Sequence, residues 1–149
     1  MYINLHSSLP FTGDGAPINR WKHWFRDQPV GETQPTHTES MIDLFPETDE
    51  YDDEDLKEST GIVLPDGSNA KFYSNVRPKV VLKHFEWMAT YGLSGVFHHR
   101  FIESIHLKNN REWKTMVLRN VKAAAEVSAM CIIYVLVCIF IHCCLIIKC

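Results

Sequence analysis

The segment GLSGVFHHRF, residues 92–101, is the strongest indication of the fold class. In it an apolar run changes abruptly into two histidines and an arginine. Gly95-Val96-Phe97 is typical of a buried strand, and His98, His99 and Arg100 stand where that strand passes into a loop. In α/β folds with parallel strands, functional side chains gather at the carboxyl ends of the strands. The segment therefore predicts a strand whose end carries a binding site.

An ordinary strand end produces the same pattern. In that alternative one histidine packs in the core, the other is solvated, and Arg100 forms an ion pair with Glu103. The residues alone leave both interpretations open.

Local signals predict a hairpin and a helix before this strand. GIVLPDGSNAKFYSN, residues 61–75, reads as two short β-prone runs joined at Asp66-Gly67, a pair that favours tight turns. Ser74 or Asn75 is the expected cap of the helix that follows, with Pro78 in its first turn. Its apolar stripe ends before Gly92, where a left-handed residue is expected to terminate the helix.

A second helix is expected after the strand, from Asn109 or Asn110 to Ala125, with Trp113, Val117 and Val121 on its apolar face. The order hairpin, helix, strand, helix is typical of an α/β domain with parallel strands.

The tail VSAMCIIYVLVCIFIHCCLII, residues 127–147, contains no formal charge. A helix of about 20 residues spans the hydrocarbon core of a bilayer, so the tail predicts a transmembrane helix. The excess of Lys and Arg before the run predicts a single-pass C-terminal anchor with a cytosolic N-terminal part. The N-terminus shows no signal peptide. The alternative is a buried structure in which AMCIIYVLV, residues 129–137, forms a parallel strand.

Charge is concentrated in one segment. Between Glu39 and Glu58 there are ten acidic residues and one lysine, whereas the whole chain carries a net charge of −3. No concentrated basic face is evident, so the sequence does not predict nucleic-acid binding. The acidic core TDEYDDEDLKEST, residues 48–60, lacks the glycine and glutamate spacing of an EF-hand. The five cysteines fall within residues 131–149 without a zinc-binding pattern, and no metal site or cofactor is predicted.

Several ordered blocks resemble the N-terminal part of glycoside-hydrolase-like proteins related to glycoside hydrolase families 71 and 99, often described as xylosidase/arabinosidase-like. They cover GDGAPINRWKHWF (13–25), SMIDLFPETDEYDDEDL (40–56), VLPDGSNAKFYSNVRPKVVLKHFEWMATYGLSGVFHHRF (63–101) and VLRNVKAAAE (117–126). The most specific part is the block that ends in GVFHHRF, in which Arg100 matches the family's arginine and His99 stands where the family commonly has glutamine.

The resemblance implies an α/β fold, the N-terminal fragment of a (β/α)8 TIM-type barrel, here followed by the C-terminal hydrophobic transmembrane helix. The expected organisation is an irregular aromatic-rich segment (1–36), an acidic loop (37–60), a partial barrel (61–126) and the membrane helix (127–147). It also implies glycan or glycoside binding by Trp24, His98, His99 and Arg100. The alternative for Trp24 is that the tryptophan-rich knot around Trp21 and Trp24 is core packing.

Departures from the family define the expected function. Glycoside hydrolysis generally needs two carboxylates that flank the scissile bond, and the family supplies them from later strands than any present here. Glu86 and Glu103 do not replace them, so no catalytic residue is predicted. The expectation is a membrane-anchored, truncated glycoside-hydrolase-like protein that is inactive or only binds glycans. Two alternatives are a glycosidase that needs a partner chain to supply the carboxylates, and a tail-anchored adaptor whose acidic segment binds a basic partner.

Overall fold

The computed structural model describes residues 11–13, 16–18, 24–25, 36–101, 108–137 and 144–148, with side chains at 24–25, 36–100 and 111–133. The chain divides into two compact units, an N-terminal unit over Leu5–Asn75 and a C-terminal unit over residues 76–149. This boundary falls inside the segment 61–126, for which the sequence predicts a single partial barrel. Each unit is described by itself.

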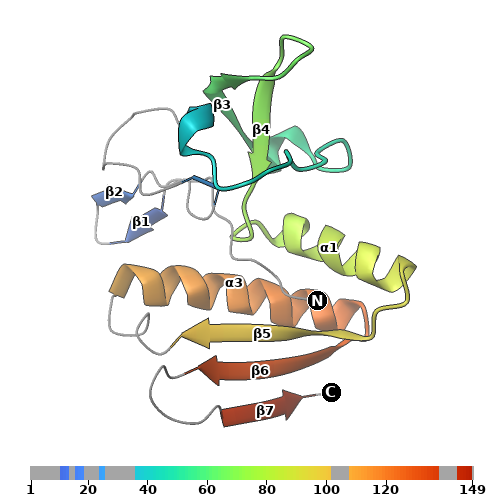
Figure 1. Ribbon diagram of the computed structural model, residues 1–149. Helices are drawn as coiled ribbons and strands as arrows, with labels where there is room; N and C mark the ends of the chain where they lie inside the picture. Colours follow the sequence, from blue (N-terminus) through green and yellow to red (C-terminus); the bar gives the residue numbers. More distant parts are fainter. Residues whose placement is uncertain are drawn as a thin grey trace. The chain divides into compact units, whose positions relative to one another are not determined.

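The N-terminal unit is built on the hairpin of β3 (Leu56–Val63) and β4 (Asn69–Tyr73), which pair antiparallel (Figure 1). Gly67 has a φ of 87°, and Ser68 donates its backbone N–H and its hydroxyl to the carboxylate of Asp66. The predicted hairpin is therefore confirmed, although β3 begins five residues earlier than residue 61.

The other elements of the N-terminal unit are short. They are the antiparallel pair β1 (Phe11–Gly13) and β2 (Ala16–Ile18) and the 3-10 turns η1 (His37–Glu39) and η2 (Asp53–Asp55). The core of the unit is an apolar cluster of Trp24, Phe25, Ile62, Ala70 and Phe72.

The C-terminal unit begins with helix α1 (Pro78–Thr90), in which Pro78 occupies the first turn as predicted. The residue before the helix is Arg77, so the cap lies two or three residues later than expected. Gly92 has a φ of 71° and donates its N–H to the carbonyl of Ala89, which confirms the predicted left-handed end. Val80, Val81, Phe85 and Met88 are buried at helical spacing.

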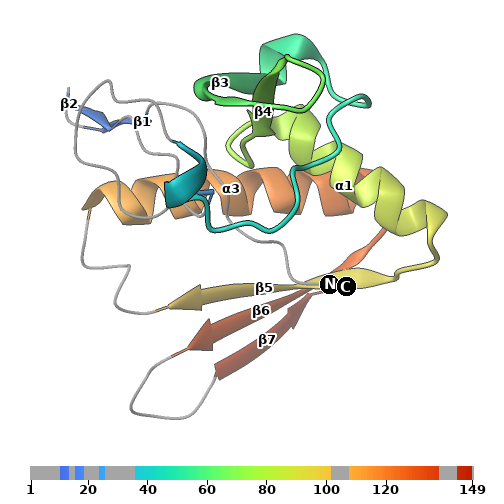
Figure 2. The ribbon, with the colours of Figure 1, turned by 45° about the horizontal axis from the view of Figure 1, so that its top comes forward.

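A sheet of three strands follows: β5 (Gly95–Phe101), β6 (Cys131–Val137) and β7 (Cys144–Lys148). Helix α3 (Lys108–Val127) connects β5 to β6, which are parallel and in register from Gly95 opposite Cys131 to Phe101 opposite Val137. Both helices, α1 and α3, lie on one face of this sheet (Figures 1 and 2). The predicted strand and second helix are thus confirmed.

Close contact between β5 and β6 begins at Gly95. A Cβ atom built on Gly95 would overlap the carbonyl oxygen of Cys131, so only glycine fits this position. The N–H of Cys131 also donates to the carbonyl of Ser94, at 3.0 Å. The backbones of β5 and β6 are therefore in close contact at the amino end of β5.

The prediction of a transmembrane helix over residues 127–147 is wrong. Helix α3 ends at Val127, Ala129 adopts a φ of 52°, and residues 131–137 and 144–148 form β6 and β7. Among the described residues, no helix is both long and apolar enough to cross a membrane. The alternative of a parallel strand at the start of the tail is what the structure shows.

The physical reason is the composition of the tail. CIIYVLV is rich in β-branched and aromatic residues, which favour strands, and it pairs directly with β5. A run without charges is compatible with a membrane helix and also with strands buried in a sheet. The length of the run alone therefore does not distinguish the two structures.

The prediction of a (β/α)8 barrel fragment is also wrong. A barrel of that type has only parallel strands, whereas β7 pairs antiparallel with β6, from Ile132 opposite Lys148 to Leu136 opposite Cys144. The β3–β4 hairpin forms a sheet of its own. Across the part of the chain that the structure describes, the architecture is two helices with small, separate sheets.

Candidate functional site

The alternation of side chains along β5 decides which of its polar residues face the helices. Val96 and His98 are buried, 2% and 5% exposed, whereas Phe97 between them is 47% exposed. Because alternate residues of a strand share a face, Arg100 lies on the same side as Val96 and His98. The carboxyl half of β5 therefore presents His98 and Arg100 to the helix-covered side of the sheet.

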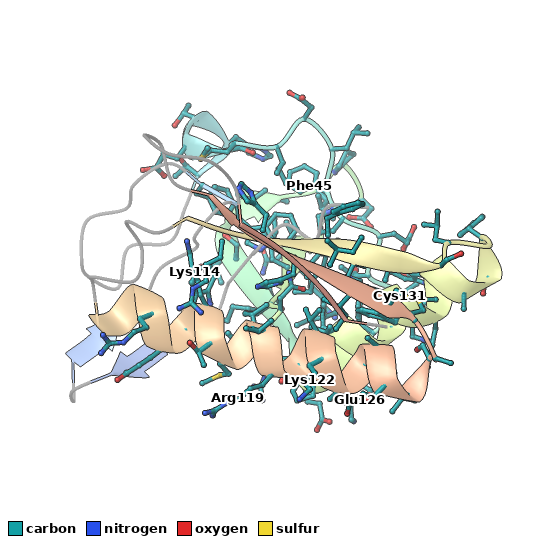
Figure 3. All side chains as sticks on the ribbon, turned by 90° about the horizontal axis from the view of Figure 1, so that it is seen from below. Phe45, Lys114, Arg119, Lys122, Glu126 and Cys131 are labelled. Atoms are coloured by element: carbon teal, nitrogen blue, oxygen red, sulfur yellow. The ribbon has the colours of Figure 1, made fainter. Side chains whose placement is uncertain are left out.

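Helix α3 contributes its first turns to the same place. Arg100 Nη2 donates to the carbonyl oxygen of Arg111 at 3.3 Å and to the hydroxyl of Thr115 at 3.4 Å. Lys114, in the same part of α3, is only 8% exposed. Figure 3 shows Lys114 on one side of the helix, while Arg119, Lys122 and Glu126 project from the opposite side.

Sequence periodicity explains why a lysine is buried here. Val117 and Val121 follow Lys114 by three and seven residues, so the three side chains lie on one stripe of α3. Both valines are fully buried. Lys114 therefore lies on the helix face that carries the core. We call His98, Arg100, Arg111, Lys114 and Thr115 the β5–α3 cluster.

The cluster joins buried His98 and Lys114 to half-buried Arg100 and exposed Arg111. Burial, and then the positive charges of Arg100, His99 and Lys114, lower the pKa of His98 to about 4. Burial and the charge of Arg111 lower the pKa of Arg100 as well. At neutral pH His98 is therefore an uncharged imidazole among cationic side chains.

These residue types are suited to binding and poorly suited to glycoside hydrolysis. An arginine and a lysine donate hydrogen bonds to oxygen atoms, and a neutral imidazole both donates and accepts. The strands that meet at this end, GVFHHRF and CIIYVLV, contain neither Asp nor Glu. The pair of carboxylates that hydrolysis requires does not arise from β5 or β6.

The structure brings together two of the predicted site residues, His98 and Arg100, on one face of β5. His99 follows the alternation to the other face and is half-buried. The alternative in which one histidine packs in the core describes His98 well. The proposed ion pair between Arg100 and Glu103 lies outside the described residues.

Trp24 belongs to the core of the N-terminal unit. It is 3% exposed, and its indole N–H donates to the carbonyl of Tyr73 at 3.1 Å. Its ring lies 5.1 Å from that of Phe72 and 5.0 Å from that of Tyr73, between centroids. Stacking on a sugar requires an open ring face, which Trp24 lacks, so we leave Trp24 out of the site. Trp21 lies outside the described residues.

The sequence interpretation missed the half of the cluster that α3 supplies. The available signal was the position of Lys114 on the apolar stripe of the helix, where a charged residue is unusual. Arg111 lies three residues before Lys114, and Thr115 is the next residue after it. No local signal links them to Arg100, because that contact depends on the return of α3 across the sheet.

An acidic cluster occurs in the N-terminal unit. One ligand atom from each of Asp52, Glu54 and Asp55 lies within 4.8 Å of the others. Asp52 and Glu54 are exposed, whereas Asp55 is buried, and exposed acidic groups are common without an ion. The nearby Asp53 pairs with Lys71 at 2.6 Å. We assign no metal to this cluster.

Comparisons of the chain with protein-family models, with curated proteins and with solved structures gave no match. The relationship to glycoside-hydrolase-like proteins therefore stays a prediction that rests on the sequence blocks.

Proposed function

We propose that the chain binds a glycan at the carboxyl end of β5 and does not hydrolyse it. The observation that carries this proposal is the β5–α3 cluster, which gathers hydrogen-bond donors from two elements at one strand end. The resemblance of residues 63–101 to glycoside-hydrolase-like proteins suggests the ligand class. The proposal does not include a membrane anchor.

The proposal that the chain does not hydrolyse glycans is supported by the kinds of side chains described at the site. A glycosidase needs an acid to protonate the leaving oxygen and a second carboxylate as base or nucleophile. The described side chains of β5 and α3 include two carboxylates, Glu112 and Glu126, which stand fourteen residues apart on the helix. About 21 Å of helix rise separates their backbone positions, far more than the ~5–10 Å required.

Binding, by contrast, needs donors with restricted side chains. Arg100 is held against α3 by its two hydrogen bonds, and His98 is held by burial. Side chains that are already ordered lose little entropy when a ligand arrives. Sugar hydroxyls and ring oxygens accept hydrogen bonds from such donors.

The test is binding of mannosides, glucans and xylosides to the full chain, first on a glycan array and then by titration calorimetry. The proposal expects saturable binding that Arg100→Met weakens and Arg119→Met leaves unchanged. Arg119 is the matched control, because it is an exposed arginine of α3, the helix that Arg100 contacts. Release of reducing sugar by the purified chain, or binding that is indifferent to Arg100→Met, would overturn the proposal.

A second candidate function concerns the N-terminal unit. Met41 and Leu44 are 60% and 84% exposed, and Phe45 is partly exposed beside them. The acidic segment 47–55 follows directly. Apolar side chains next to a run of carboxylates favour a basic amphipathic segment of a partner protein, as in the adaptor alternative.

Fluorescence anisotropy with a basic amphipathic peptide tests this second function. The expected result is binding that weakens as salt is raised and that Leu44→Asp abolishes, since a charge there opposes the apolar contact. Val63→Asp is the control, because Val63 is exposed on the hairpin away from the 41–45 segment in sequence. Equal binding by both variants would contradict it.

A further inference from the structure

The exposed apolar side chains of the N-terminal unit lie close in sequence to a hydroxyl group that the second candidate function does not use. We call residues 41–49 the docking segment. It contains the exposed Met41 and Leu44, and near its end Thr48 stands between Glu47 and Asp49. Any change in the charge of Thr48 would therefore occur within the proposed docking surface.

The backbone of Thr48 is held in place, whereas its hydroxyl is not. Its N–H donates to Glu47 Oε1 at 3.0 Å, and its carbonyl accepts from the N–H of Tyr51 at 3.1 Å. Its Oγ1 forms no hydrogen bond with a described residue. Other hydroxyl groups of the same unit are hydrogen-bonded, among them those of Thr36, Thr38, Ser40 and Ser68. Thr48 therefore presents a hydroxyl that can react without loss of an internal bond.

Tyr51 carries the other hydroxyl of the acidic run, and its surroundings differ. Its ring lies 5.4 Å from that of Tyr73, between centroids. Burial is the main cause of the raised pKa of Tyr51. An enzyme could reach the Tyr51 hydroxyl only by separating packed rings, so Thr48 is the more accessible of the two.

The backbone around Thr48 is suited to recognition by a modifying enzyme. Between the end of η1 at Glu39 and the start of η2 at Asp53, the chain forms neither a helix nor a strand (Figure 1). A segment without such hydrogen bonds can enter an enzyme groove at a small cost in local unfolding.

The charges beside Thr48 indicate which class of enzyme fits. Asp43, Glu47 and Asp49 are exposed, and none of them forms an ion pair with another described residue. Glu50 adds a further exposed carboxylate two residues after Thr48. Carboxylates in this arrangement attract a basic substrate groove and repel an acidic one.

We infer that Thr48 is a phosphorylation site for an acidophilic serine/threonine kinase, and that the phosphate tightens binding of a basic partner at the docking segment. The second half of this inference rests on the second candidate function. The kinase transfers the γ-phosphoryl group of a nucleoside triphosphate to Thr48 Oγ1. The bond from the γ-phosphorus to the bridging oxygen breaks, the Oγ1–phosphorus bond forms, the hydroxyl proton passes to a base of the kinase, and a nucleoside diphosphate leaves.

The effect on binding follows from the charge of the new group. A phosphate ester adds about −1.5 to −2 charge at neutral pH and three oxygens that accept hydrogen bonds. Lysine and arginine side chains of a basic partner would then meet the phosphate together with the carboxylates of Glu47 and Asp49. Hydrogen bonds between charged partners are roughly twice as strong as those between neutral ones.

The modification is tested by incubating the full chain with ATP and an acidophilic kinase, and by locating the phosphate with mass spectrometry. We expect one phosphate on Thr48, and none there after treatment with a kinase that prefers basic segments. Thr48→Val should lose the modification. Thr60→Val, at an exposed threonine of β3, is the control and should keep it. Circular dichroism verifies that both variants are folded.

The regulatory half is tested by fluorescence anisotropy with an amphipathic helical peptide of leucine and lysine. The phosphorylated chain is expected to bind this peptide at least about fivefold more tightly than the unmodified chain. Phosphatase treatment should reverse the gain, and raised salt should reduce it. Thr48→Val, taken through the same kinase treatment, should show no gain.

The outcomes separate the two claims. Peptide binding without phosphate on Thr48, or with equal affinity before and after phosphorylation, overturns this inference while the docking function stands. Phosphorylation of Thr48 without peptide binding by either form supports the modification site and overturns the docking function. Absence of both phosphorylation and binding overturns both.

Discussion

The two ends of the layer formed by β5 and α3 are built from different chemistry. At the amino end of β5, Gly95 lies against Cys131, and the later turns of α3 bury Val121, Ala124 and Ala125. At the carboxyl end, the same strand and the same helix bring Arg100 and Lys114 near enough to His98 to lower its pKa.

The difference indicates which end contributes more to the stability of the fold. Close apolar packing contributes stability roughly in proportion to the area it removes from water. Arg100, at the other end, is held by two long hydrogen bonds to neutral oxygens, which contribute less. We expect substitutions at the apolar end to change stability and substitutions at the cationic end to change binding.

The largest expected effect is at a buried aromatic residue of the apolar packing. Phe85 is fully buried in α1, and Phe85→Ala removes its ring and leaves a cavity. The expected loss is about 3–5 kcal/mol of unfolding free energy, measured by urea denaturation of the full chain. Tyr91→Ala, at an 81% exposed position, is the control and should cost little. A loss under about 1 kcal/mol for Phe85→Ala would contradict the claim that the apolar packing supplies most of the stability.

Gly95→Ala should have the next largest effect. The new methyl group would overlap the Cys131 carbonyl oxygen, so the backbones of β5 and β6 must separate. We expect a loss of about 2–3 kcal/mol in the same denaturation experiment, because backbone cannot yield as a flexible side chain can. An unchanged midpoint would show that the pairing of β5 and β6 is looser than described.

Acid should weaken the fold through two buried histidines, His84 in α1 and His98 in β5. Burial lowers the pKa of each to about 4, from an ordinary value near 6.5. As pH falls from 7 to 5, the unfolded chain therefore binds protons that the folded chain does not, and stability falls. Each histidine should contribute about 2 kcal/mol to this loss, and His84→Phe should remove its share.

The two histidines also sharpen the comparison. His84 stacks on Trp87 at 5.6 Å and has no cation among the causes of its lowered pKa, whereas His98 has three. A glycan bound at the β5–α3 cluster should therefore shift the NMR resonances of the His98 imidazole and leave those of His84 in place. Equal shifts of both would contradict binding at the β5–α3 cluster.

The sequence could predict the elements that carry their own local signals. Pro78 and Gly92 mark the two ends of α1, Asp66-Gly67 marks the hairpin turn, and β5 follows from Gly95-Val96-Phe97. Each of these signals acts within a few residues, through backbone conformation or short-range periodicity.

The sequence could not decide what depends on distant contacts. The uncharged tail has the length of a membrane helix, and its pairing with β5 and β7, which lie far from one another in the sequence, completes residues 131–137 as a strand. The polar end of β5 was visible as His98 and Arg100, but its partners on α3 lie eleven or more residues further along the chain. Trp24 was predicted to bind a sugar, but it is buried in the core of the N-terminal unit, which the sequence did not distinguish from an exposed site.

The smallest expected effect on stability is also the most informative one. Without ligand, Arg100→Met should change the unfolding free energy by less than about 0.5 kcal/mol, because its contacts are two long hydrogen bonds to neutral oxygens. Gly95→Ala provides the contrast within the same strand. A loss comparable to that of Gly95→Ala would make the cationic end part of the fold's stability.

The central claim is tested most directly by the change in the urea midpoint that a glycan selected on the array produces. For the unchanged chain, ligand at 100 times its dissociation constant should add about 2.7 kcal/mol to the unfolding free energy. Arg100→Met should keep the ligand-free midpoint and lose most of this increase. An unchanged chain that gains nothing from the ligand, or an Arg100→Met variant that gains as much, would contradict the account.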